Sequence, residues 1–172
     1  MSFEIIHFRD SGKILTNKKM LKDVISTMQY VDDVLFGAHF KRELLRHAMD
    51  EMGWISENGN MKVMDGRQYR YKGFKKNIGI DGSFGAYEYI LEGLLRLQIG
   101  FDQGRIKAGI LMLNARRSEK TPYGSTQDLV RTEVELLYPT ISLPVSVCLF
   151  DLGNPRIPEE RYAEEACTSP DD

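Results

Sequence analysis

Apolar residues recur along this chain with the spacings of regular secondary structure. A three-and-four spacing, typical of a helix with one buried face, is found at Met20 to Leu35, about His39 to Met52, and about Ala86 to Ile99. Apolar runs typical of strands lie at Phe3 to Phe8, Lys107 to Leu113, and Val145 to Leu152. The second of these runs is continuous, as expected for a strand buried on both faces. The pattern predicts a mixed α/β (α+β) fold.

Turn-forming residues indicate how these elements connect. Asn58-Gly59 is a strong hairpin signal and Asp65-Gly66 a second one, so Trp54 to Asp81 is predicted to fold as a three-stranded antiparallel meander. Near the start of the chain, Asp10-Ser11-Gly12 predicts a tight turn into a short return strand at Lys13 to Leu15, which gives an N-terminal hairpin.

Polar residues at the expected helix starts are candidate caps. Asn17 is placed to cap the first helix, and Ser125, with Asp128 three residues later, to cap a last helix that reaches about Leu137. The predicted order is therefore helix, three antiparallel strands, helix and strand, with the N-terminal hairpin before it and a C-terminal helix and strand after it.

The composition of the 172 residues, 42% hydrophobic and 10% aromatic, suits one globular domain with a real core, predicted over residues 1–155. Residues 156–172 are predicted to form an acidic tail. No apolar run approaches the roughly 20 residues of a membrane span, and the chain does not begin like a signal peptide, so we expect a cytoplasmic protein. Cys148 and Cys167 support neither a disulfide framework nor a zinc site.

The net charge of −2 conceals an uneven distribution. Residues 157–172 hold six acids and one base, which leaves an excess of three positive charges on the rest of the chain. Between Lys62 and Lys76 a single acid faces six bases: Lys62, Arg67, Arg70, Lys72, Lys75 and Lys76. This stretch predicts a basic patch suited to backbone phosphates, although a solvated charged hairpin is the alternative.

One carboxylate stands at a chemically suggestive position. The strand that ends the predicted meander, 75–81, finishes on Asp81, and the bases of the preceding stretch surround it in sequence. Acids that hold a divalent cation, together with bases that bind phosphates, are what metal-dependent phosphodiester hydrolysis needs. Asp81 is also placed to end a strand and cap the helix that follows it.

Particular segments sharpen this picture. Phe40 to Leu45 followed by Gly53-Trp54, Ile78 to Gly85, Ile106 to Leu113, and Pro144 to Phe150 resemble successive core elements of the PD-(D/E)XK type II restriction endonucleases, in particular the BamHI, BglII and BstYI group. The resemblance covers residues 3–153 by element order and about 40–150 by residue pattern. It implies a restriction-endonuclease-like core and a homodimer that binds double-stranded DNA and hydrolyses it with Mg²⁺, as part of a restriction-modification system.

The resemblance also implies site residues. Asp81 takes the place of the first carboxylate of the catalytic strand, and Ser83 the place two residues later. Asp65, at one family spacing, would be the other metal ligand, and Glu57 an additional acid. At the BglII-like spacing the second acid position falls instead on Lys72, which cannot hold Mg²⁺.

Two further site roles come from the residues themselves. Glu88, in the first turn of the predicted third helix, could turn toward the metal, and Lys75 or Lys76 could polarise the scissile phosphate. Since alternate residues of a strand face opposite sides, at most one of these lysines can point inward.

DNA contacts are expected from two segments. The bases Arg67, Arg70 and Lys72 suit phosphates, and the loop from 115 to 124 could carry base contacts through Arg116, Arg117, Lys120 and Tyr123. By analogy with the family, the helix from His39 would help to form a dimer interface. Two alternatives to the nuclease stay open: a DNA-binding relative that has lost catalysis, and a globular protein-interaction domain unrelated to nucleic acid.

Overall fold

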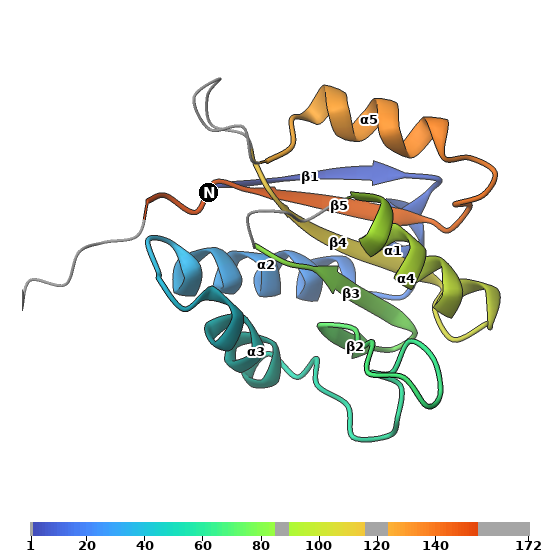
Figure 1. Cartoon of the computed structure of the whole chain (residues 1–172), viewed down its shortest axis with the longest axis horizontal. Helices are drawn as coiled ribbons and strands as arrows, with labels where there is room; N and C mark the ends of the chain where they lie inside the picture. The colour runs from blue at the N-terminus through green and yellow to red at the C-terminus, as the bar shows by residue number, and fades with distance from the viewer. Residues whose placement is uncertain (1, 85–89, 116–123, 155–172) are drawn as a thin grey trace, which may run out of the picture.

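The structure is a computed structural model that describes residues 2–84, 90–115 and 124–154. Its elements in chain order are β1 (Phe3–Phe8), α1 (Ser11–Asn17), α2 (Leu21–Leu35), α3 (Lys41–Glu51), β2 (Gly73–Lys75), β3 (Ile78–Gly82), α4 (Ile90–Asp102), β4 (Ala108–Asn114), α5 (Gln127–Leu136) and β5 (Val145–Phe150). Within the described residues the strands form one sheet in the order β1-β5-β4-β3-β2 (Figure 1). The inner pairs are parallel, whereas β1 and β2 run antiparallel to their neighbours.

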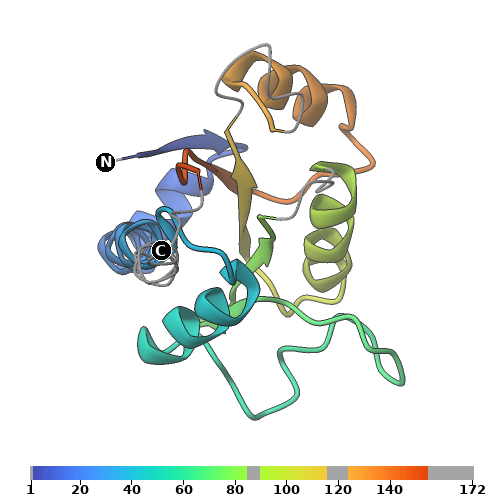
Figure 2. The same ribbon diagram turned by 60° about the vertical axis from the view of Figure 1, so that its left-hand side comes forward.

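Helices cover both faces of this mixed sheet. Figure 2 shows α1, α2 and α3 on one side of the strands and α4 and α5 on the other. Side chains of β4 alternate between the two layers: Ile110 and Met112 pack toward the first group of helices, and Leu111 and Leu113 toward the second. The same alternation decides which helix each side chain of β3 meets.

The long amphipathic segments fold as predicted. Val24, Met28 and Val31 on α2 are fully buried, since their spacing places them on one side of the helix. Helix α4 lies close to the sheet at Gly93, where a Cβ atom would be 2.4 Å from Cδ1 of Leu111. The third predicted helix is thereby held against β4.

The predicted three-stranded meander is wrong in part. β2 and β3 pair as expected, but the third strand is reduced to a single bridge between Lys62 and Arg70. The hairpin turn is at Lys76 and Asn77, both with positive φ, 48° and 64°. Asn58-Gly59 and Asp65-Gly66 do mark turns, but few residues between them are buried, so little packing energy supports strands there.

The predicted N-terminal return strand is also wrong, since Ser11–Asn17 forms helix α1. Ser11 is buried, and its hydroxyl donates to the carbonyl oxygen of Val145 at 3.0 Å and lies 2.8 Å from Oγ of Ser146. These contacts with β5 hold the segment beside the sheet, so the chain after β1 enters a helix rather than a second strand.

Two predicted helix caps differ by a few residues. Asn17 belongs to the end of α1, and Met20 is the residue before α2. The cap of α5 is Thr126 rather than Ser125, since the Thr126 hydroxyl accepts from the backbone N–H of Leu129 at 3.2 Å. Within the part of the chain that the structure describes, no helix has both the length and the apolar character needed to cross a membrane.

Candidate functional site

The end of β3 places one acid inside the protein. Asp81 is 1% exposed, on the face of the sheet that α4 covers. The chain then passes very close to β4 at Gly82, where φ is 109° and a Cβ atom would lie 2.1 Å from the carbonyl oxygen of Met112. Only glycine fits there. Because the backbone is fixed on both sides, the carboxylate of Asp81 has a defined position.

The carboxylate of Asp81 forms an ion pair with Arg96 of α4. Nε of Arg96 donates to Oδ2 at 2.6 Å and Nη2 to Oδ1 at 3.4 Å, while the backbone N–H of Gly82 donates to Oδ1 at 2.7 Å. The Arg96 side chain is 26% exposed. Both oxygens of the buried acid therefore accept hydrogen bonds from within the protein.

Arg96 is absent from the candidates that the sequence pattern indicates. A signal did exist: Arg96 is the only base in 90–102, with leucines on both sides of it. A helix that follows a strand packs back on the sheet, so a base among its apolar residues is a candidate partner for a strand-end acid. The pairing becomes evident only when α4 is placed over β3.

Lys72 is the second base near Asp81, and its positive charge acts on that carboxylate. The pairing of β2 with β3 ends where Gly73 pairs with Ile80, and Lys72, the residue before Gly73, donates its backbone N–H to the carbonyl oxygen of Ile80 at 2.8 Å. Of the two spacings that the family resemblance left open, the second thus names a residue that lies near the end of β3. Asp65 is exposed, next to a turn glycine.

Burial governs the ionisation of this acid. Loss of water raises the pKa of Asp81 above its ordinary value, and the ion pair with Arg96, the N–H of Gly82 and the charge of Lys72 oppose that rise. The protein thus surrounds this carboxylate with internal donors and positive charge.

The other predicted catalytic and metal-binding residues are dispersed. Glu57 is exposed, Ser83 is half-buried, and Glu88 lies outside the described residues. Nζ of Lys75 donates to Asp23 at 2.8 Å and to the carbonyl oxygen of residue 52 at 2.9 Å, and Lys76 is in the turn that precedes β3. Both lysines are at the end of β3 remote from Asp81. Among the described residues, no three His, Cys, Asp or Glu side chains gather as a metal site.

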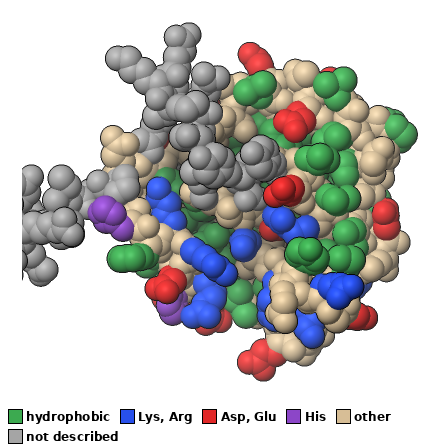
Figure 3. All heavy atoms as spheres, viewed as in Figure 1, with side chains coloured by type: hydrophobic (Ala, Val, Ile, Leu, Met, Phe, Trp, Pro, Cys, Tyr) green, Lys and Arg blue, Asp and Glu red, His purple; other side chains and the backbone are tan. Residues whose placement is uncertain are grey.

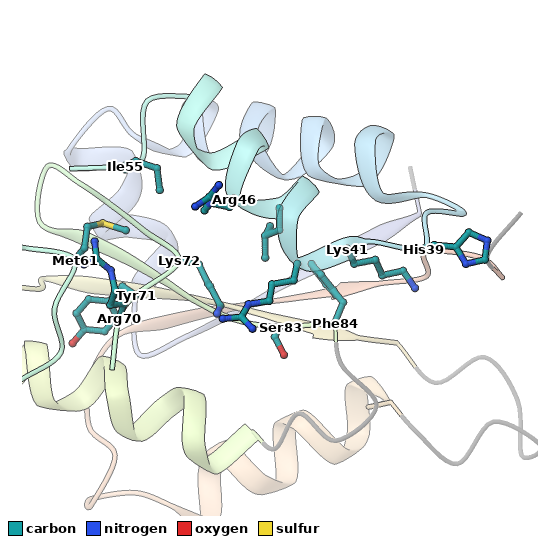
Figure 4. Close-up of a pocket in the computed structure, with 12 residues that line it drawn as sticks. His39, Lys41, Arg46, Ile55, Met61, Arg70, Tyr71, Lys72, Ser83 and Phe84 are labelled. Carbon is teal, nitrogen blue, oxygen red and sulfur yellow. The ribbon is translucent and has the colours of Figure 1, made fainter. Parts of the chain in front are cut away.

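A basic cleft opens beside the end of β3, with a volume of about 920 Å³. It is lined by His39, Lys41, Arg42, Leu45, Arg46, Ile55, Met61, Arg70, Tyr71, Lys72, Ser83 and Phe84. In Figure 4, Lys41 and Arg46 belong to α3, and Lys72 and Ser83 lie across from that helix. These described lining residues include five Lys or Arg side chains and one histidine, His39, but no Asp or Glu. Figure 3 shows Lys and Arg gathered on this part of the surface.

The predicted DNA-binding residues have different outcomes. Arg70 and Lys72 line the cleft, whereas Arg67 is exposed and does not line it. Arg116, Arg117, Lys120 and Tyr123 lie outside the described residues. The helix from His39 was predicted to help form a dimer interface, which stays a prediction, and three of its bases, Lys41, Arg42 and Arg46, line the cleft. The spacing of four residues between Arg42 and Arg46 was the available signal, since it places these two on one side of the helix.

Comparisons with known proteins bear on the fold. No protein-family model matches the sequence, and no curated protein matches it. The chain is similar to the restriction endonuclease BglII complexed with a DNA 16-mer, with a TM-score of 0.61 and 11% identity over 90% of this chain and 77% of that chain. It is similar to free BglII as well, with a TM-score of 0.55 and 12% identity over 88% and 80%. The chain has a restriction-endonuclease-like fold, as the sequence resemblance predicted.

Proposed function

We propose that this protein binds double-stranded DNA in the basic cleft between α3 and the end of β3. The observation that carries this proposal is the convergence of Lys41, Arg42, Arg46, Arg70 and Lys72 on one cleft, with no acid among its described lining residues. A groove lined by one sign of charge raises the local concentration of a polyanion and speeds its association.

The residue types suit phosphate contacts. Guanidinium groups of Arg42 and Arg46 can each donate two parallel hydrogen bonds to a phosphate, and the lysines add point charges. Since the bases come from α3 and from the chain that leads into β2, a backbone seated between them would be contacted from two sides. This arrangement orients a duplex without reading its sequence.

The choice of duplex DNA over other polyanions rests on the fold. BglII, to which the chain is similar, is a restriction endonuclease seen in complex with DNA. Sequence readout would come from the loop that holds Arg116, Arg117, Lys120 and Tyr123. A homodimer is part of the proposal, because two clefts related by twofold symmetry would engage two half-sites.

Site-specific hydrolysis of DNA, the activity of a type II restriction endonuclease, is the second candidate function. It is supported by the position of Asp81 at the end of β3, with Ser83 on the wall of the same cleft. Mg²⁺, if held there by Asp81 and Asp65 with Glu57 or Glu88, would supply Lewis-acid activation of water and of the phosphate. The described residues do not fit this ion well, since both oxygens of Asp81 already accept hydrogen bonds.

A salt series tests the binding proposal. Fluorescence anisotropy with a 30-base-pair duplex gives the association constant at each salt concentration. The logarithm of this constant, plotted against the logarithm of the salt concentration, should have a slope near −4.5, because about 0.9 counterion is released for each of five neutralised phosphates. Arg42→Gln and Arg46→Gln should each make the slope shallower by about 0.9. Arg131→Gln removes an exposed base on α5, across the sheet from the cleft, and should leave the slope unchanged.

The results separate the candidate functions. DNA binding that is absent or insensitive to salt would refute the DNA-binding proposal and leave a protein-interaction domain as the remaining candidate. Plasmid and unmethylated bacteriophage DNA, incubated with Mg²⁺ or Mn²⁺, test hydrolysis. Cleavage by the wild type that Asp81→Ala abolishes would establish the enzyme, and binding without cleavage would establish the non-catalytic relative.

A further inference from the structure

The guanidinium group of Arg96 lies against the carboxylate of Asp81 at the end of β3. We propose that Arg96, together with Lys72, takes the place of a divalent cation at Asp81, so that Asp81 serves as a fixed counter-ion for internal bases rather than as a metal ligand. The inference concerns the ion chemistry of this chain and does not depend on whether DNA enters the cleft.

The hydrogen bonds of Asp81 carry the first step. Oδ2 accepts from Nε of Arg96 at 2.6 Å, and Oδ1 accepts from the N–H of Gly82 at 2.7 Å and faces Nη2 of Arg96 at 3.4 Å. A metal ion needs a lone pair directed at it, and a carboxylate offers about four. Three donors of the described residues are already directed at the oxygens of Asp81, which leaves about one position for an ion, beside a guanidinium group.

Charge balance carries the second step. One negative charge on Asp81 stands beside the positive charges of Arg96 and Lys72, so the cluster is already positive by one unit. A magnesium site usually combines one or two carboxylates with waters and other oxygen ligands. Among the described residues no group of three potential ligands forms a metal site, and the charges that act on Asp81 are those of Arg96 and Lys72, so an added divalent ion would face net repulsion.

The anchoring of Arg96 carries the third step. The carbonyl oxygen of Arg96 accepts from the hydroxyl of Tyr71 at 2.6 Å, and Tyr71 is itself buried. Tyr71 also packs close to Gly100, where a Cβ atom would lie 2.6 Å from its hydroxyl oxygen. Helix α4 is therefore held at the start of β2, and the guanidinium approaches Asp81 from a fixed backbone.

Paramagnetic broadening by Mn²⁺ provides the test. The ¹⁵N-labelled protein, without DNA, is titrated with substoichiometric Mn²⁺ while backbone amide signals are followed. An ion on Asp81 would lie next to the amide of Gly82 and would broaden that signal first. We expect the Gly82 signal of the wild type to broaden no more than amides remote from the cleft. Selective broadening that Asp81→Asn abolishes would overturn the proposal.

A variant designed to gain metal binding tests whether Arg96 and Lys72 are what excludes the ion. Arg96→Gln combined with Lys72→Glu removes both bases and places a second carboxylate at residue 72, near Asp81. The double variant should bind Mn²⁺ at least tenfold more tightly than the wild type, with broadening centred on Gly82. Arg131→Gln is the control for loss of one base and should behave as the wild type.

The remaining outcomes are also decisive. A folded double variant, with a dispersed spectrum, that gains no Mn²⁺ binding would refute the idea that the two bases exclude the ion. If the double variant does not fold, the wild-type titration alone decides. Since no DNA is present, failure of DNA binding in the salt series would leave this result unaffected.

Discussion

Replacing Arg96 by Met should expose the energetic role of the buried ion pair. The change keeps much of the aliphatic stem but leaves the carboxylate of Asp81, 1% exposed, without its charged partner. Removing one partner of a buried pair costs about 3 to 5 kcal/mol. Because the Arg96 side chain is 26% exposed, water reaches the pair, and we expect the lower end, about 3 kcal/mol at pH 7.

Asp81→Asn should cost less, about 1 to 2 kcal/mol, because a neutral amide can still accept from the N–H of Gly82 and leaves only a partly hydrated base behind. The double variant Asp81→Asn/Arg96→Met should then lose about 3 kcal/mol, less than the sum of the single losses. The difference, about 1.5 kcal/mol, is the coupling between the two side chains.

The pH dependence of the folding stability is an independent check on the same variants. Burial raises the pKa of Asp81, and loss of Arg96 removes the largest influence that opposes the rise. A carboxyl group whose folded-state pKa is raised destabilises the fold while it is ionised, so stability recovers as pH falls through that pKa. The deficit of Arg96→Met should therefore be smaller at pH 5 than at pH 7.

Urea unfolding of the four proteins at pH 7 and pH 5 measures these quantities, and the single tryptophan gives one well-defined fluorescence probe. Additive losses in the double variant, or a deficit of Arg96→Met that is the same at both pH values, would refute the reasoning. Either result would mean that Asp81 is hydrated in solution and that the pair contributes little.

Three further substitutions probe the supports of the site, each by urea unfolding with a matched control. Gly82→Ala should cost about 3 kcal/mol because its Cβ meets a carbonyl oxygen of β4, whereas Gly66→Ala, also at positive φ but in open space, should cost about 1 kcal/mol. Gln98→Leu should cost about 2 kcal/mol, since its Oε1 accepts from the N–H groups of residues 142 and 143, whereas Gln103→Leu, at an exposed position, should cost little. Thr27→Val should cost about 1 kcal/mol by leaving the buried indole N–H of Trp54 unpaired, and Thr27→Ser should not. Equal effects of variant and control would contradict each prediction.

Long periodic segments were predictable because their burial pattern is repeated many times. Helix α2 has an apolar residue at nearly every position that faces the sheet, β4 is apolar up to its last residue, and β5 is apolar apart from Ser146. Each such segment has one packing arrangement that buries its apolar side. The predicted element order of the core follows from these segments.

Turn signals were less informative because a turn does not create strands. Gly59 and Gly66 adopt positive φ as their sequence contexts predict, yet the described residues around them form only one isolated bridge, between Lys62 and Arg70. The turn that pairs β2 with β3 uses Lys76 and Asn77, where no glycine signals it. That pairing depends on β3 being fixed by its other neighbour, β4, which is distant in sequence.

At the candidate site, too, the local sequence pattern predicted one part and tertiary packing set the rest. A strand-end acid at Asp81 was predictable from the local pattern, but its partners were not. Arg96 comes from a helix on one face of the sheet, and Lys72 lies just before the residue where the pairing of β2 with β3 ends. Both neighbours are set by tertiary packing, whereas the sequence pattern favoured Asp65 as the partner of Asp81 and gave Lys72 only under a second spacing.

Backbone geometry and charge are separable at this strand end. The parallel pairing with β4 and the close approach at Gly82 fix where an acid on β3 lies, whatever its neighbours are. The side chains that meet it then decide the chemistry: carboxylates would favour a cation, whereas Arg96 and Lys72 neutralise it internally. Lys72 also lines the cleft, whereas Arg96 does not. A basic cleft and a strand-end acid with a structural role can therefore coexist in this fold, because the cleft has four further bases, Lys41, Arg42, Arg46 and Arg70, besides the one that the two features share.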